Sequence, residues 1–215
     1  MHWFTRLFRR PKQLELTADL RRRIRGSFEE AARDEEHFPS TIDPRIYHVQ
    51  LILEQFGDLA GRRVLDAGCG KGRFARVLKE RHPQAEVVAL DLAQAMLRSV
   101  PEGISPVCAS MTSLPFAEGS FDAAYATESL EHAVEIDIAV AEICRVVRPG
   151  GRIVIIDKNA EKWGRFKTPE WERWFRREEI ERLLARHCSE VSSRFISYWE
   201  DVEPDGLFLA WLARR

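Results

Sequence analysis

From residue 61 onward, hydrophobic positions follow two alternating periods, one typical of strands and one typical of helices. Short apolar runs with the length of buried strands occur at residues 62–68, 86–92, 104–110, 121–127 and 152–157. Segments with the apolar spacing of helices lie between them, at residues 72–83, 93–100 and 137–147. This alternation predicts an α/β fold with a parallel sheet that helices cover on both faces.

The C-terminal region has a different pattern. A helical segment at residues 177–188 precedes two strand-like runs, at residues 190–199 and 206–215. The sequence between these runs, "EDVEPDG", is rich in turn-forming residues. We therefore expect an antiparallel hairpin at one edge of the sheet.

Composition indicates an ordinary globular chain without a membrane span. The 215 residues are 45% hydrophobic and 31% charged, with a formal net charge of −1. No apolar stretch approaches the ~18–20 residues that cross a bilayer, and the first residues lack the apolar block of a signal peptide. The four cysteines are scattered without metal-ligand spacing, so we expect reduced thiols, a cytoplasmic location and no metal site.

Charge is distributed unevenly at the N-terminus. Residues 1–25 carry a net charge of +6 and residues 26–60 a net charge of −6. Two interpretations fit the first segment. It could be a basic arm that binds a membrane surface or nucleic acid, with an apolar face formed by Trp3, Phe4, Leu7 and Phe8. Alternatively, it could be a solvated helix whose charge is neutralised by the acidic segment that follows. We favour the second interpretation and expect no nucleic-acid partner, while peripheral membrane contact stays open.

The change of charge and the start of the strand and helix alternation predict three parts of the chain. They are a basic segment at residues 1–26, a helical cap at 27–60 and one α/β domain at 61–215. The cap includes an amphipathic helix that begins after Pro44. A monomer and a homodimer both remain open.

The glycine-rich loop after the first predicted strand, in "VLDAGCGKGRF", limits the choice of ligand. Its spacing is Gly-x-Gly-x-Gly, whereas a dinucleotide-binding loop has Gly-x-Gly-x-x-Gly, and Lys71 is not followed by the Ser or Thr of a phosphate-binding P-loop. Asp66 at the strand end repels pyrophosphate and suits a cationic ammonium group. Asp91 ends the next strand, where an acid accepts hydrogen bonds from ribose hydroxyls. An NAD-type oxidoreductase is therefore the weaker interpretation.

Four segments together carry a resemblance to a known family. They are "VLDAGCGKG", "VVALDL", "SLPFAEGSFDAAYATESLEH" and "EICRVVRPGGRIVIID", in order along residues 61–158. In these segments the chain resembles the class I S-adenosylmethionine-dependent methyltransferases of the small-molecule kind, called type 11 or UbiE-like. The resemblance implies a Rossmann-like, seven-stranded, mostly parallel sheet. It also implies methyl transfer from S-adenosylmethionine to an O, N or C nucleophile of a small-molecule acceptor.

The resemblance also implies how the cofactor is held. Asp66 would contact the methionyl ammonium group, and Asp91 would hold the ribose hydroxyls. The backbone of Gly68, Cys69 and Gly70 would run beneath the methionine and ribose. Leu92 would pack against the adenine, and Thr127 would lie near the sulfonium.

One position departs from the family pattern. Family members usually have an acid in the third loop that accepts from the adenine amino group, and this chain has Ser110 there. Ser110 or the backbone of Met111 would have to replace that contact. The departure keeps open a catalytically silent module that binds S-adenosylmethionine and regulates another process.

Methyl transfer depends mainly on in-line positioning, and a base is needed only if the acceptor must lose a proton. His132, which follows the fourth predicted strand in "LEHA", is the candidate catalytic base; the alternative is a structural histidine. Glu128 and Glu131 flank it and are candidates to orient it.

Two further segments contain candidate substrate residues. Residues 159–176 concentrate aromatic side chains, among them Trp163 and Trp171, which fit either an aromatic lid over the acceptor or an extra helix packed on the core. In the predicted N-terminal helix, Tyr47 and His48 are candidates to cap the carboxylate end of the cofactor. The alternative for both is a place on the helix surface.

Overall fold

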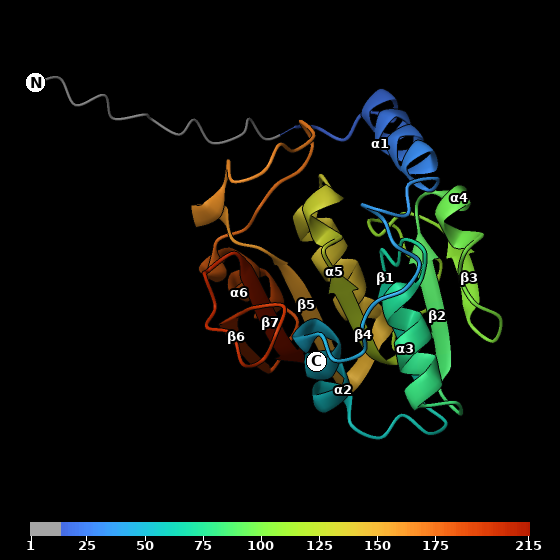
Figure 1. Ribbon diagram of the computed structural model, residues 1–215. Coiled ribbons are helices and arrows are strands. Elements are labelled where there is room, and N and C mark those ends of the chain that lie inside the picture. Colours follow the sequence, from blue (N-terminus) through green and yellow to red (C-terminus); the bar gives the residue numbers. More distant parts are fainter. Residues whose placement is uncertain (1–13) are drawn as a thin grey trace, which may run out of the picture.

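The computed structural model describes residues 14–215 and contains a single seven-stranded sheet (Figure 1). Its strand order is β3-β2-β1-β4-β5-β7-β6. The strands are β1 Arg63–Ala67, β2 Glu86–Asp91, β3 Ser105–Cys108, β4 Phe121–Thr127, β5 Val147–Lys158, β6 Glu190–Ile196 and β7 Phe208–Arg214. Strands β1 to β5 pair in parallel, and the last two pair antiparallel to their neighbours. The expected Rossmann-like α/β fold is confirmed.

Helices connect the strands and cover the sheet. The α-helices are α1 Ala18–Ala31, α2 Tyr47–Phe56, α3 Arg73–Arg81, α4 Gln94–Leu97, α5 Ile136–Val146 and α6 Arg177–Leu184. Two 3-10 turns, η1 Leu130–His132 and η2 Ala160–Lys162, follow β4 and β5. The helix expected at residues 93–100 is a single turn, α4, which ends before Pro101. Within residues 14–215, no helix combines the length and apolar character needed to cross a membrane.

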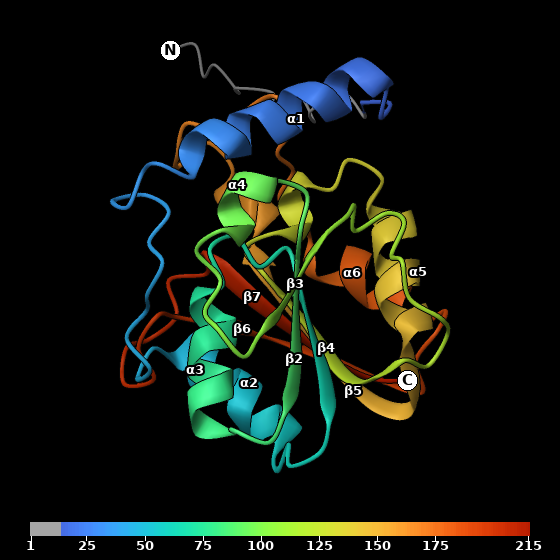
Figure 2. The same cartoon turned by 90° about the vertical axis from the view of Figure 1, so that its right-hand side faces the viewer.

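Both faces of the sheet are buried because side chains of successive strand residues point to opposite sides. In β5, Ile153 and Ile155 pack into one core with α5 and α6, whereas Val154 and Ile156 pack into the other with α2 and α3. The two helix pairs lie on opposite sides of the sheet in Figure 2. Continuous apolar runs, rather than alternating ones, are therefore the pattern that this sheet requires.

In the C-terminal hairpin, the second strand in sequence, rather than the first, pairs with the rest of the sheet. Strand β7 lies between β5 and β6, so the last strand of the chain is internal and β6 is the edge. Burial explains this choice, since most of β7 is buried while most of β6 is partly or fully exposed. The more apolar strand thus occupies the position that is covered on both faces.

Helix α1 lies across the edge of the sheet where the parallel strands end (Figure 2). The Thr17 side chain caps it by accepting from the Leu20 N–H at 3.1 Å, and the Glu29 carboxylate accepts the N–H groups of Gln94 and Ala95 at 2.8 and 3.0 Å. Helix α1 continues through residues 26 and 27, where we expected the basic segment to end and the cap to begin. The apolar face expected around Trp3 lies outside the described residues.

Candidate functional site

The glycine-rich loop joins β1 to α3 and turns sharply beneath an open space. Gly68 has a φ of 82°, and a Cβ added there would lie 2.4 Å from the Cβ of Ser129. The N–H groups of Gly68 and Cys69 donate to the Leu90 carbonyl at 2.8 and 2.9 Å, which ties the loop to β2. Only glycine satisfies both the backbone conformation and the close approach at residue 68.

Two carboxylates end the neighbouring strands β1 and β2 beside this loop. Asp66 is buried, and its Oδ2 atom has no hydrogen-bond partner among the described residues. Burial raises the pKa of Asp66 to about 7. Asp91 accepts from the Gly70 N–H at 2.8 Å and from the Ala93 N–H at 2.9 Å, and burial also raises its pKa. A cationic ligand would therefore satisfy the free oxygen of Asp66.

A cavity of about 530 Å³ opens over the loop and extends beneath α1. It is lined by most of the residues expected from the sequence: Asp66, Gly68, Cys69, Gly70, Asp91, Leu92, Ser110, Met111, Thr127, His132 and Trp171. The fold brings them together because the carboxyl ends of parallel strands meet at one edge of the sheet.

Three expected substrate residues are placed elsewhere. The His48 ring is fully buried on α2, stacked on Tyr198 with ring centroids 4.7 Å apart, so its alternative place on the helix surface is wrong. Tyr47 is half-buried beside Arg194. Trp163 packs edge-on against Trp174 at 5.3 Å, away from the cavity lining.

Residues 159–176 form neither of the two expected arrangements as a whole. Beyond the short turn η2 the segment has no helix, so the extra helix is wrong, yet Trp174 and Phe175 are buried in the two cores. Trp171 lines the cavity. The segment is therefore anchored by its last aromatic residues and exposes one indole to the cavity.

Ser110 lines the cavity in the third loop and makes local contacts. Its hydroxyl lies 2.8 Å from the Thr112 hydroxyl and accepts from the Thr112 N–H at 3.2 Å. These bonds give the loop a tight turn without an acid. The side chain of Met111 is buried beside it.

Glu128 occupies a strained position where β4 ends. Its φ of 51° is the only positive value among the described non-glycine residues. Its carboxylate pairs with Arg73 at 3.3 Å and accepts from the Tyr198 hydroxyl at 3.2 Å. Both Glu128 and Arg73 line the cavity, so the strain is located at the site.

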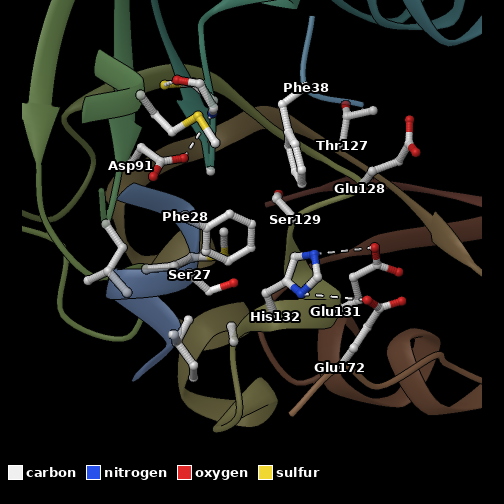
Figure 3. A pocket seen from close by; sticks show the side chains of 18 of the residues that line it. Ser27, Phe28, Phe38, Asp91, Thr127, Glu128, Ser129, Glu131, His132 and Glu172 are labelled. Carbon is white, nitrogen blue, oxygen red and sulfur yellow. Dashed lines mark hydrogen bonds and ion pairs between the residues drawn. The ribbon is translucent and has the colours of Figure 1, made fainter. Parts of the chain in front are cut away.

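The other end of the cavity contains a polar cluster around His132 (Figure 3). The ring Nε2 lies 3.6 Å from Glu131 Oε1, and Nδ1 lies 4.0 Å from Glu172 Oε2. The Phe28 ring of α1 packs edge-on against the imidazole with centroids 5.0 Å apart. Burial lowers the pKa of His132 to about 3, so the ring is neutral at physiological pH.

Two residues of β5 complete this cluster. The Lys158 ammonium pairs with Glu131 Oε1 and lies 4.0 Å from Glu172 Oε1. Asp157 accepts the Glu131 N–H at 3.0 Å. Burial raises the pKa of the carboxyl groups of Glu131, Asp157 and Glu172. The cluster therefore holds three buried carboxyl groups and one ammonium group.

Sequence reasoning missed several residues that line the cavity. Phe28 and Phe38 come from the cap, Lys158 from the end of β5, and Glu172 from the irregular segment. The position of Lys158 directly after an apolar strand was a signal for a site residue. Glu172 had no such signal, because 40 residues separate it from His132 along the chain.

Parts of the chain are similar in sequence to known methyltransferases. Residues 65–155 match the family model described as a methyltransferase domain. The chain is 37% identical over 97 residues to a malonyl-[acyl-carrier protein] O-methyltransferase of Methylococcus capsulatus, which covers 42% of this chain and 35% of that protein. It is 34% identical over 123 residues to the demethylmenaquinone methyltransferase of Renibacterium salmoninarum, with 55% and 51% covered. The chain thus matches about half or less of the length of these relatives.

A solved structure extends the similarity to the whole fold. Geranyl diphosphate C-methyltransferase from Streptomyces coelicolor A3(2), in complex with Mg²⁺, geranyl diphosphate and S-adenosyl-L-homocysteine, has a TM-score of 0.69 and 15% identity to this chain. The match covers 94% of this chain and 100% of that one. At this identity the comparison shows a shared fold.

Proposed function

We propose that the protein is a class I S-adenosylmethionine-dependent methyltransferase, which transfers a methyl group from S-adenosylmethionine to a small-molecule acceptor. The match of residues 65–155 to a methyltransferase domain and the similarity to curated methyltransferases support this proposal. The observation that carries the proposal is the pair of carboxylates, Asp66 and Asp91, beside the glycine-rich loop at the end of β1 and β2. They lie where open α/β sheets bind nucleotide-like ligands.

The proposed cofactor contacts follow from the chemistry of each side chain. The free Oδ2 of Asp66 accepts the methionyl ammonium, and Asp91, held by two backbone N–H groups, accepts the ribose hydroxyls. The backbone of Gly68, Cys69 and Gly70 runs beneath the methionine. A side chain at residue 68 would clash with Ser129 and displace this turn.

The adenine and sulfonium ends have their own contacts in this proposal. Leu92 packs against the adenine, and Ser110 or the Met111 backbone takes the place of the usual acid. Thr127, whose buried Oγ1 has no hydrogen-bond partner among the described residues, lies near the sulfonium. The Arg73 guanidinium offers a cation to the methionyl carboxylate.

The reaction itself requires alignment more than chemical assistance. A lone pair of the acceptor attacks the methyl carbon, the carbon–sulfur bond breaks, and its electron pair stays on sulfur. Holding the reacting atoms in line is worth several kcal/mol (about 7 or more in well-oriented systems). His132, neutral and facing the cavity beside Phe28 and Glu131, is the proposed catalytic residue because it can accept a hydrogen bond from the acceptor.

The acceptor is proposed to be a small molecule because the cavity is bordered by side chains of the cap and of the irregular segment. Phe28, Phe38 and Trp171 supply apolar surface around the polar end. The four free cysteines support the cytoplasmic location expected from the sequence. A monomer or a homodimer remains the prediction for the assembly.

Isothermal titration with S-adenosylhomocysteine and S-adenosylmethionine tests the cofactor site. We expect Asp91→Asn to weaken both ligands about 100-fold, since it removes the charge that binds the ribose. Asp137→Asn, an exposed carboxylate on α5, is the matched control and should bind normally. Equal binding by Asp91→Asn and the unmodified chain would refute the assignment.

The departure at Ser110 favours one second candidate, a module that binds the cofactor without turnover. The two functions differ in one measurement, the release of S-adenosylhomocysteine when purified protein and S-adenosylmethionine are incubated with a library of small hydroxyl, amine and carbon-acid acceptors. Release that depends on one acceptor supports the enzyme. Tight cofactor binding with no release supports the silent module.

A further inference from the structure

Two cysteines that are distant in the sequence meet on the face of the sheet that α5 and α6 cover. Cys144 lies in the last turn of α5, and Cys188 lies in the connection between α6 and β6. The two helices pack on the same side of the sheet (Figure 2), and the two Sγ atoms are 3.8 Å apart. The fold thus makes a pair from two thiols that are separated by 44 positions along the chain.

The two thiols differ in their access to solvent. Cys144 is only 1% exposed and belongs to the apolar core beneath α5 and α6. Cys188 is half-buried at the rim of the same core, and its neighbours in sequence, His187 and Ser189, are exposed. A small solute can therefore reach Cys188 first, and Cys144 is the thiol in contact with it on the inner side.

The surroundings favour the ionised, nucleophilic form of the outer thiol. The hydrogen bond with Cys144 is the main cause that lowers the pKa of Cys188, and the Arg215 guanidinium adds to it, against the opposing effect of burial. Arg215 is held there because it donates to the carbonyl oxygens of Arg145, at 2.7 Å, and Val147. The same hydrogen bond, together with burial, raises the pKa of Cys144, which stays protonated.

The separation of the sulfur atoms is small enough for a bond between them. A disulfide bond is about 2.0 Å long, so the two Sγ atoms need to approach each other by less than about 2 Å. Cys188 is anchored by its N–H, which donates to the Leu184 carbonyl at 2.9 Å, but its side chain lies in a connection of mostly exposed residues. Rotation of this side chain can supply the approach while the helices stay in place.

We propose that Cys188 and Cys144 are a modification site, at which hydrogen peroxide forms a reversible disulfide bond. The Cys188 thiolate attacks one peroxide oxygen, the oxygen–oxygen bond breaks, and Cys188 becomes a sulfenic acid as hydroxide leaves. The Cys144 sulfur then attacks the Cys188 sulfur, and the departing hydroxide takes the Cys144 proton to form water. In total, two thiols are oxidised to one disulfide, and one hydrogen peroxide is reduced to two molecules of water.

The disulfide fastens α5 to the end of α6. It restricts the unfolded chain by closing the long loop between the two cysteines, and this restriction stabilises the folded state. We therefore expect oxidation to raise the midpoint of thermal unfolding by about 5 to 10 °C. Neither cysteine lines the cavity, so S-adenosylhomocysteine affinity should stay the same. The inference is independent of the proposed function.

Counting the thiols of the folded chain before and after treatment with hydrogen peroxide tests the site. The thiols are alkylated in denaturant and counted by intact-mass spectrometry, and we expect the treatment to remove two of the four. Dithiothreitol should restore both. Cys188→Ser and Cys144→Ala should each abolish this paired loss. Cys108→Ser, which removes an exposed thiol outside the pair, is the matched control and should keep it.

Thermal unfolding of the reduced variants shows whether each one folds, and Cys188→Ser decides the result if the buried substitution Cys144→Ala does not. A paired loss that persists in Cys188→Ser overturns the proposal. So does oxidation of Cys108 under conditions that leave Cys144 and Cys188 free, or a loss of thiols that dithiothreitol does not reverse. A disulfide between two chains, visible on a non-reducing gel in place of the internal one, overturns it as well.

Discussion

The two ends of the cavity are built in different ways. At the proposed cofactor end, Asp66, the glycine-rich loop and Asp91 lie within 26 consecutive residues at the ends of two adjacent parallel strands. At the proposed acceptor end, which surrounds His132, this residue meets Phe28 from α1 and Glu172 from the irregular segment. One end is therefore encoded locally, and the other is assembled from distant parts of the chain.

The largest effect on ligand affinity should come from a substitution at Gly68, in the locally encoded end of the cavity. Gly68→Ala combines a φ of 82° with a Cβ 2.4 Å from that of Ser129, so we expect S-adenosylhomocysteine affinity to fall by more than about 100-fold. Isothermal titration and thermal unfolding measure the two consequences. Gly57→Ala also has a positive φ, 63° with ψ −137°, and nothing within 4 Å, so it should cost about 1 to 3 kcal/mol of stability and no affinity. Similar losses of affinity in both variants would show that the contact with Ser129 is unimportant.

A smaller effect, about fivefold, should appear in the pH dependence at the same end. Because the pKa of Asp66 is about 7 in the folded chain, its ionised fraction rises from about a tenth to about a half between about pH 6 and pH 7. Affinity for the methionyl ammonium should rise in proportion. Asp66→Asn should bind weakly at every pH, and a pH dependence that survives this change would assign the titration to another group.

Stability should move in the opposite direction over the same range. The folded chain keeps a proton on Asp66 up to about pH 7, whereas the unfolded chain loses it near 3.8, so stability of the unliganded chain falls as the pH rises between these values. Denaturant unfolding of the unmodified chain and Asp66→Asn measures this contribution, which the variant lacks.

An effect of similar size, but confined to α1, should appear at the proposed acceptor end. Glu29 ties α1 to the rest of the molecule through the N–H groups of Gln94 and Ala95. Glu29→Ala should cost about 1 kcal/mol locally and speed amide hydrogen exchange in α1 about fivefold, with little change in global stability. Glu30→Ala, its exposed neighbour, is the control. Unchanged exchange in Glu29→Ala would show that other contacts, such as Lys71 with Glu35 at 2.7 Å, hold the cap.

The sequence by itself determined the parallel sheet, its helices and the grouping of Asp66, the glycine-rich loop and Asp91 at the proposed cofactor end. These follow from apolar runs of strand length, from glycines where the chain must turn tightly, and from acids placed directly after strands, all of which are local signals. The four quoted segments also carried the resemblance to methyltransferases, and a methyltransferase-domain model matches residues 65–155.

Tertiary structure alone decided the rest. It placed β7 inside the sheet and β6 at its edge, since the more apolar strand gains more from burial on both faces. It buried His48, moved Trp163 away from the cavity and set Glu172 beside His132. Contacts between residues distant in sequence depend on how whole elements pack, and no local pattern of hydrophobic and polar residues specifies them.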